Sequence, residues 1–239
     1  MTSSQHIRSA FDRDLEMITS KMLKMGGLVE SSIVDAAEAF EKRDLELAQN
    51  VRKRDKKIDA LEAEINEDIT RIIALQAPAA SDLRTLLSIL KIAGNLERIG
   101  DYSKNMAKRT NVLSTLPVIE NSSSSLQRLV REVQQMLKDA LDAYTQRDSE
   151  LGISIIARDR EVDEIYNSLF RELLTYMMED ARNITACMHL HFIAKNIERM
   201  GDHVTSIAEQ VIFVVTGELP AERRDKADIT STNADLSKG

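Results

Sequence analysis

A seven-residue segment occurs twice in this chain, and the repetition constrains the fold more than any other feature. Residues 95–101 read NLERIGD and residues 196–202 read NIERMGD, so five of the seven positions are identical at a shift of 101 residues. The two positions that differ are apolar in both copies. A repeat of this length indicates an internal duplication, and we expect two similar halves.

The duplication extends beyond this segment. Further matching elements recur at a common shift of 104 residues, in the same order along the chain. They are Arg43-Asp44 with Arg147-Asp148, Arg54-Asp55 with Arg158-Asp159, and Asp59 with Asp163. Each half therefore repeats most of the other.

Composition and periodicity predict that both halves are helical. The chain has only 8 Gly and 3 Pro among 239 residues and no Trp, which is typical of long helices. Apolar residues recur at helical spacing in six segments. The predicted helices cover about residues 6–42, 44–76, 81–108, 126–146, 151–178 and 183–216. We expect an all-α fold of two tandem, pseudo-symmetric three-helix bundles.

Breaks in the pattern divide the chain. We expect a first three-helix bundle in residues 1–110, a linker in residues 111–125 and a second bundle in residues 126–217. Residues 218–239 are polar and lack periodicity, so we expect a disordered tail.

Charge and composition disfavour several classes of protein. The formal net charge is −7, which disfavours non-specific binding to nucleic acid. Cys187 is the only cysteine, so no internal disulfide can form. No apolar run approaches the ~18 residues of a membrane span, and the first residues lack the pattern of a signal peptide. We expect a cytoplasmic protein.

Each half contains two acidic pairs with a spacing of four residues. Glu97 and Asp101 form such a pair inside the repeated segment, and Asp55 and Asp59 form another on the preceding helix. Residues four apart lie on one face of a helix, where like charges are unfavourable by a few tenths of a kcal/mol. We therefore expect a cation to neutralise these faces.

The positions of the pairs predict that they meet. The centres of the first two pairs, positions 57 and 99, lie equally far from Pro78, where the chain turns. The corresponding centres in the second half, 161 and 200, are equidistant from the predicted turn at residues 179–182. Because both helices of an antiparallel hairpin rise 1.5 Å per residue, four carboxylates should converge in each half, roughly 30 Å from the turn.

Two kinds of cation could neutralise these carboxylates, arginine side chains or bound metal ions. In the first interpretation Arg54, Arg98, Arg158 and Arg199 pair with the acids, and the clusters are structural. In the second, oxygen ligands hold divalent metal ions of uncertain identity, Mg²⁺, Mn²⁺, Fe or Zn²⁺, with hard ions favoured. Four acids against two arginines in each half favour the second. The predicted metal ligands are Asp55, Asp59, Glu97, Asp101, Asp159, Asp163, Glu198 and Asp202.

Both copies of the repeated segment also contain a glycine directly before the aspartate. Gly100 and Gly201 each cost about 1 kcal/mol inside a helix. Their missing side chains leave room either for ions or for close helix packing, and the sequence leaves both explanations open.

These motifs resemble those of the PhoU family, the accessory regulators of the high-affinity phosphate transport system. The resemblance rests on the doubled Glu-Arg-x-Gly-Asp element, the doubled pair of aspartates four apart, and the segment QAPAASDLR at residues 76–84. The second half lacks a counterpart of that last segment, so a role of Asp82 or Arg84 with a partner cannot be doubled.

The resemblance implies a function without catalysis. A protein of this family would be a negative regulator of the phosphate (Pho) regulon. It would be a metal-binding adaptor that links the ATPase subunit of the phosphate transporter to a phosphate-sensing histidine kinase, often as a homodimer, and it would control phosphate uptake. Two alternatives remain at this point: a metal-dependent phosphohydrolase that uses the carboxylate clusters, and a helical scaffold without metal.

Overall fold

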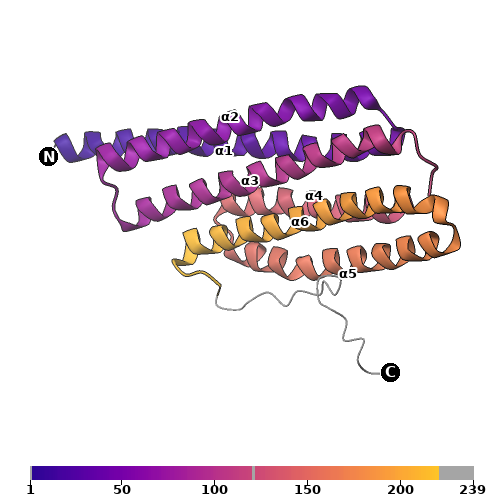
Figure 1. Ribbon diagram of the computed structural model, residues 1–239. Helices are drawn as coiled ribbons and strands as arrows, with labels where there is room; N and C mark the ends of the chain where they lie inside the picture. Colours follow the sequence, from indigo (N-terminus) through magenta and orange to yellow (C-terminus); the bar gives the residue numbers. More distant parts are fainter. Residues whose placement is uncertain (1, 120–121, 221–239) are drawn as a thin grey trace.

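The chain folds into long antiparallel helices (Figure 1). This computed structural model describes residues 2–119 and 122–220, with side chains for residues 10–119 and 124–220. The helices are α1 (Thr2–Lys42), α2 (Leu45–Gln76), α3 (Ala80–Leu113), α4 (Ser122–Gln146), α5 (Ser149–Glu179) and α6 (Ile184–Thr216), with a single 3₁₀ turn, η1 (Ala181–Asn183). The described residues contain no strand, and none of their helices has a stretch long and apolar enough to cross a bilayer. The prediction of six helices in an all-α fold is confirmed.

The helix ends follow the predicted breaks closely, with one difference. α3 continues to Leu113 and α4 begins at Ser122, so the connection between them is shorter than the expected linker of residues 111–125. Burial of Leu113 against the core favours the extra turn of α3. The expected tail falls mostly in residues 221–239, which lie outside the described residues.

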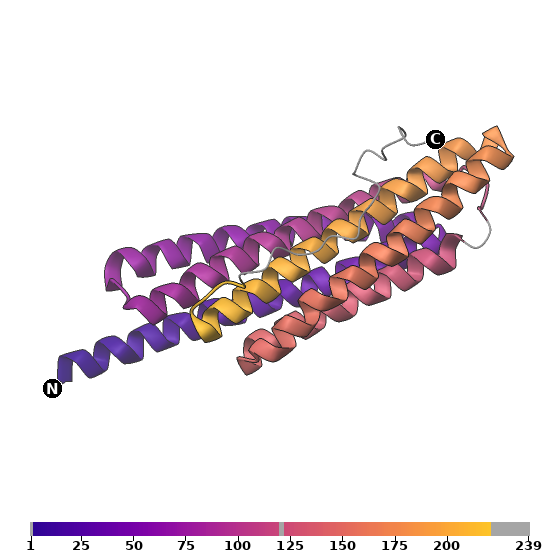
Figure 2. The same cartoon turned by 90° about the horizontal axis from the view of Figure 1, so that it is seen from below.

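The two halves are built alike and lie side by side. α1, α2 and α3 pack on one another, as do α5 and α6 with α4. α3 also packs along α6, and α1 contacts α4, so the two bundles meet along their length (Figure 2). The molecule is therefore an elongated array in which α3 and α6 occupy the middle.

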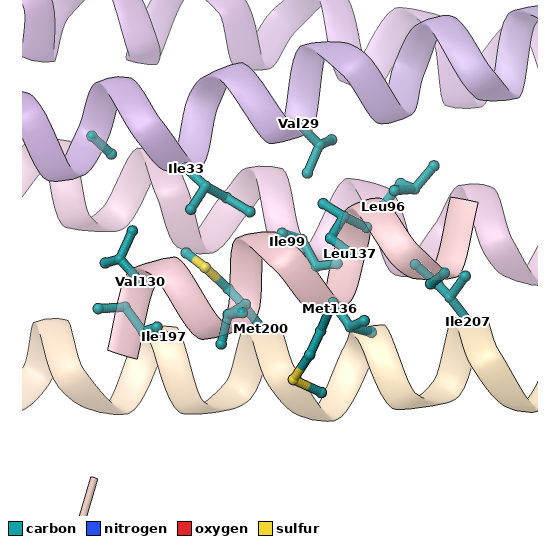
Figure 3. Close-up of a cluster of buried hydrophobic side chains, with 14 of the residues drawn as sticks. Val29, Ile33, Leu96, Ile99, Val130, Met136, Leu137, Ile197, Met200 and Ile207 are labelled. Carbon is teal, nitrogen blue, oxygen red and sulfur yellow. The ribbon is translucent and has the colours of Figure 1, made fainter. Parts of the chain in front are cut away.

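The apolar core is continuous between the bundles. Figure 3 shows Val29 of α1, Leu96 of α3, Leu137 of α4 and Met200 of α6 gathered in one region. All four side chains are fully buried in a cluster that includes residues of every long helix. Burying an aliphatic side chain of this size contributes about 1.5–3 kcal/mol. The contact between the halves is thus part of the main core.

A glycine permits the close approach of α1 and α4. A Cβ atom added at Gly26 would lie only 2.6 Å from Cδ1 of Leu141 on α4. The next residue, Gly27, has nothing within 4 Å of such an atom. The helix runs through both residues without interruption. Gly26 therefore serves the junction between the bundles.

Candidate functional site

The acidic pairs of the first half meet between α2 and α3. Asp55 of α2 is buried, with 5% of its surface exposed. Nζ of Lys104 on α3 lies 2.5 Å from Oδ2 of Asp55 and 2.5 Å from Oδ1 of Asp101. Burial lowers the pKa of Lys104, but hydrogen bonds to Asp101 and Asp55 outweigh it and the net pKa is raised. A lysine ammonium thus lies between two of the predicted ligands.

The other two acids of this cluster remain close enough to interact. Burial, together with the smaller effects of the charges of Asp101, Glu62 and Asp59 and against the opposing charge of Arg98, raises the pKa of Glu97 to about 7. Partial loss of solvent also raises the pKa of Asp59, although that side chain lies at the exposed edge. The cluster therefore carries more negative charge than Lys104 neutralises.

In the second half, three of the four predicted acids are buried. Asp159 and Asp163 of α5 and Glu198 of α6 expose 7%, 5% and 3% of their surfaces. Nζ of Lys195 lies 3.0 Å from Oε2 of Glu198. A Cβ atom at Gly201 would lie 3.2 Å from Oδ1 of Asp159, so the acidic face of α5 directly contacts the repeated segment of α6.

The arginines of the alternative interpretation mostly bind elsewhere. Arg54 pairs with Asp35 of α1 at 2.7 Å. Arg158 pairs with Glu132 and Asp139 of α4, at 2.7 and 2.6 Å. These pairs connect the acid-bearing helix of each half to the first helix of its bundle. Arg98 contacts its neighbour Glu97 at 3.6 Å from an exposed position.

Sequence reasoning missed the two lysines. Lys104 follows Asp101 by three residues and Lys195 precedes Glu198 by three, a spacing that places each pair on one helix face. That spacing was available in the sequence as a signal. The resulting pairs are within single helices, while Lys104 also reaches Asp55 on the neighbouring helix.

The two repeated glycines allow close packing. A Cβ atom at Gly100 would lie 3.1 Å from Cδ1 of Ile58, and one at Gly201 would lie 3.3 Å from Cγ1 of Val162. Both distances are shorter than ordinary van der Waals contact. Helix packing thus explains Gly100, whereas Gly201 also adjoins the Asp159 carboxylate.

The first cluster has the donor chemistry for a metal ion but is not arranged as a finished site. Among the described side chains, no three His, Cys, Asp or Glu residues are placed to hold one ion. Oδ1 of Asp55, however, is buried and has no hydrogen-bond partner. An unsatisfied carboxylate oxygen beside further carboxylates fits a hard cation. The predicted ligand set remains a prediction.

The histidines and the cysteine near α6 serve other contacts. His203 lies 2.8 Å from Oδ1 of Asn95 through its Nδ1 atom, and the His191 ring lies 5.1 Å from the Phe170 ring. Cys187 is buried, and burial raises the pKa of its thiol. A buried, protonated thiol is unreactive, which agrees with a packing role.

Comparison with known proteins identifies the family. The family model described as "PhoU domain" matches residues 22–110 and 126–211, once in each half. A phosphate-specific transport system accessory protein PhoU homolog from Rhizobium meliloti is 46% identical over 230 residues, which cover 96% of this chain and 97% of that protein. A homolog of the same description from Caulobacter vibrioides is 45% identical over 95% of this chain and 99% of its own length.

Two solved crystal structures resemble the fold of this chain. The crystal structure of PhoU from Pseudomonas aeruginosa superposes with a TM-score of 0.85 at 40% identity, covering 87% of this chain and all of that one. The phosphate transport system regulatory protein PhoU from Streptococcus pneumoniae gives a TM-score of 0.81 at 28% identity, over 88% of this chain and 99% of that one. With two copies of the family's domain and full-length relatives in sequence and structure, this chain belongs to the PhoU family.

Proposed function

We propose that this protein is an accessory regulator of phosphate transport that acts as a metal-binding adaptor and as a negative regulator of the Pho regulon. It would link the ATPase subunit of the phosphate transporter to a phosphate-sensing histidine kinase in the cytoplasm, most simply as a homodimer. The transport role follows from the names of relatives that match nearly the whole chain. Nothing in this role requires catalysis by the protein.

The proposal of metal binding depends on how the acidic side chains are arranged. In the first half, carboxylates from two helices surround one ammonium group and leave a buried oxygen of Asp55 without a partner. A divalent ion held by Asp55, Asp59, Glu97 and Asp101 would supply the missing positive charge. Asp159, Asp163, Glu198 and Asp202 would do the same in the second half.

Metal analysis tests the two clusters. The combined variant Asp55→Asn, Asp59→Asn, Glu97→Gln and Asp101→Asn should lower the bound metal by about half, because the second cluster is separate from the first. The control carries Asp35→Asn, which changes an acid paired with Arg54 outside the cluster. Equal metal content in wild type and combined variant would contradict the proposal.

A deletion strain tests the regulatory part. Without the protein, phosphate-starvation genes should be expressed even in rich phosphate, because the kinase no longer receives the signal that phosphate is plentiful. Reporter expression at high and low phosphate measures this. Normal repression in the deletion strain would count against a negative regulator.

The second candidate is a metal-dependent phosphohydrolase. It is favoured by the Glu97 carboxyl, whose pKa of about 7 suits a general base at neutral pH. Turnover of a phosphate ester with added Mn²⁺ or Mg²⁺, lost in Glu97→Ala, would support this function over the adaptor. The adaptor proposal expects no such turnover.

A further inference from the structure

An exposed apolar stripe follows α6 near its beginning. Ile184, Met188 and Phe192 succeed one another every four residues, so they lie along one side of the helix. Their exposed fractions are 44%, 39% and 43%. Single exposed apolar residues need no explanation, but a row of three large ones is characteristic of a contact surface.

Neighbouring helices extend this stripe. Arg109 contacts His189 and Asn95 contacts His203, so α3 and α6 run antiparallel with Val112 level with the turn between Ile184 and Met188. On the other side, Phe170 lies against His191 and Asn183 bonds to Tyr176, which places Leu174 and Met178 of α5 at the same levels. Figure 1 shows α6 running between α3 and α5. We call Val112, Leu174, Met178, Ile184, Met188 and Phe192, all exposed, the α6 apolar surface.

An arginine without an acidic partner borders this surface. The Arg109 guanidinium lies over the Phe192 ring, 4.3 Å from its centroid, and Nη1 lies 3.2 Å from Nδ1 of His189. Its Nε atom is buried without a hydrogen-bond partner. Among the described side chains, no carboxylate lies within ion-pair distance of Arg109. Burial lowers the pKa of this guanidinium.

We propose that the α6 apolar surface docks an amphipathic helix of a partner protein, and that a carboxylate of that helix pairs with Arg109. Apolar residues at i and i+4 of the docked helix would cover Met188 and Phe192, as in other helix-in-groove contacts. The stacking on Phe192 holds the guanidinium in place before binding, so little side-chain entropy is lost. This inference rests on the proposed adaptor function, since it supplies a surface for one of the two partners.

Charge favours an acidic helix over two other occupants of the surface, an anionic membrane and a second copy of this chain. An anionic membrane attracts clusters of several basic residues, whereas the surface defined above is apolar and belongs to a chain of net charge −7. A second copy docked through the same surface would bring another Arg109 and no carboxylate among the defined surface residues. An acidic amphipathic helix satisfies both the apolar side chains and the guanidinium.

Binding of purified partners tests the proposal. The probes are the ATPase subunit of the phosphate transporter and the cytoplasmic part of the sensor kinase, each titrated with the full-length protein. Met188→Ser with Phe192→Ser should weaken binding to one of them at least tenfold. Arg109→Gln should weaken the same complex at least fivefold, and Arg109→Lys should lose less. The matched control is Leu75→Ser, which removes a more exposed leucine at 77% exposure from the end of α2.

The outcomes separate the two proposals. Wild-type binding that none of the α6 surface variants changes would overturn this inference and leave the adaptor function intact. Failure of the wild type to bind either probe would contradict the adaptor function itself. If the variants instead abolish self-association in sedimentation, or retention on phosphatidylglycerol vesicles, the surface covers a second copy or a membrane and the proposed helix is wrong. Circular dichroism of each variant checks that the helices are retained.

Discussion

At the residue scale, the main difference from expectation is which cations neutralise the acids. Arg54 and Arg158 directly precede Asp55 and Asp159, but consecutive side chains point about 100° apart on a helix. The arginines therefore reach α1 and α4, and the ammonium of Lys104 fills the space between Asp55 and Asp101. Sequence spacing predicted that four acids converge in each half, and in the first half the structure brings Asp55 and Asp101 to one ammonium group. The spacing could not decide which long side chain of a neighbouring turn would bend toward them.

Replacing the ammonium should destabilise the metal-free protein. In Lys104→Met the carboxylates of Asp55 and Asp101 lose their shared partner, and we expect a loss of about 1–3 kcal/mol in the free energy of unfolding. Urea unfolding in a chelator measures the loss. Lys42→Met is the control, because its pair with Glu38 is exposed and worth little. If the cluster binds metal where the ammonium lies, added Mn²⁺ should raise the free energy of unfolding more in Lys104→Met than in the control. An equal rise in both variants would show that the ion does not occupy this position.

At the scale of helices, the repeated turns were predicted only in part. The repeated Arg43-Asp44 element marks the start of α2, where the Asp44 carboxylate accepts a hydrogen bond from the backbone N–H of Leu47. Asp148 makes the equivalent bond to Leu151. The preceding residues, Arg43 and Arg147, adopt left-handed conformations with φ of 54° and 56°. Nothing in an arginine side chain favours that conformation, so sequence alone could not reveal it.

The caps give a paired prediction. Asp44→Ala and Asp148→Ala should each lower the free energy of unfolding by about 1 kcal/mol, because each removes a side-chain acceptor from the first turn of a helix. Thermal or urea unfolding measures both. Asp44→Asn and Asp148→Asn, which keep a capping oxygen, should be much milder; losses as large as those of alanine would mean that charge, rather than capping, matters.

The contact of α3 with α6 should depend on pH. Burial lowers the pKa of His189 and the charge of Arg109 lowers it further, so the folded protein favours the neutral imidazole that accepts a hydrogen bond. The unfolded chain binds this proton first, so the contribution is present above about pH 6.5 and is lost as pH falls through the folded pKa. Between pH 7.5 and 5.5, wild type should lose more stability than His189→Gln. Parallel pH profiles would contradict this.

At the scale of the whole molecule, duplication predicted the two bundles but not how they join. The helical pattern identifies apolar faces, but it does not show that α3 packs on α6 as well as on α1 and α2 of its own bundle. The core between the halves includes Val29, Leu137 and Met200, which the sequence presents as ordinary core residues. Gly26 leaves the space that Leu141 of α4 occupies. Such pairing between repeats depends on three-dimensional shape that periodicity does not encode.

Adjacent glycines test the junction. Gly26→Val should lower the free energy of unfolding by about 1–3 kcal/mol, because its side chain enters space occupied by Leu141 of α4. Gly27→Ala should raise it by about 0.5–1 kcal/mol, because the added methyl meets nothing and improves helix propensity. Chemical denaturation of the two variants measures both signs. A similar effect at both positions would show that α1 and α4 do not approach closely at Gly26.

The lysine between Asp55 and Asp101 has a wider consequence. Acidic side chains that only a metal ion neutralises repel one another once the metal is removed, and this repulsion destabilises the fold. A chain whose own lysine neutralises these acids keeps its fold without a bound ion. Binding or release of an ion would then change the surface charge while the fold stays intact, as reversible signalling requires.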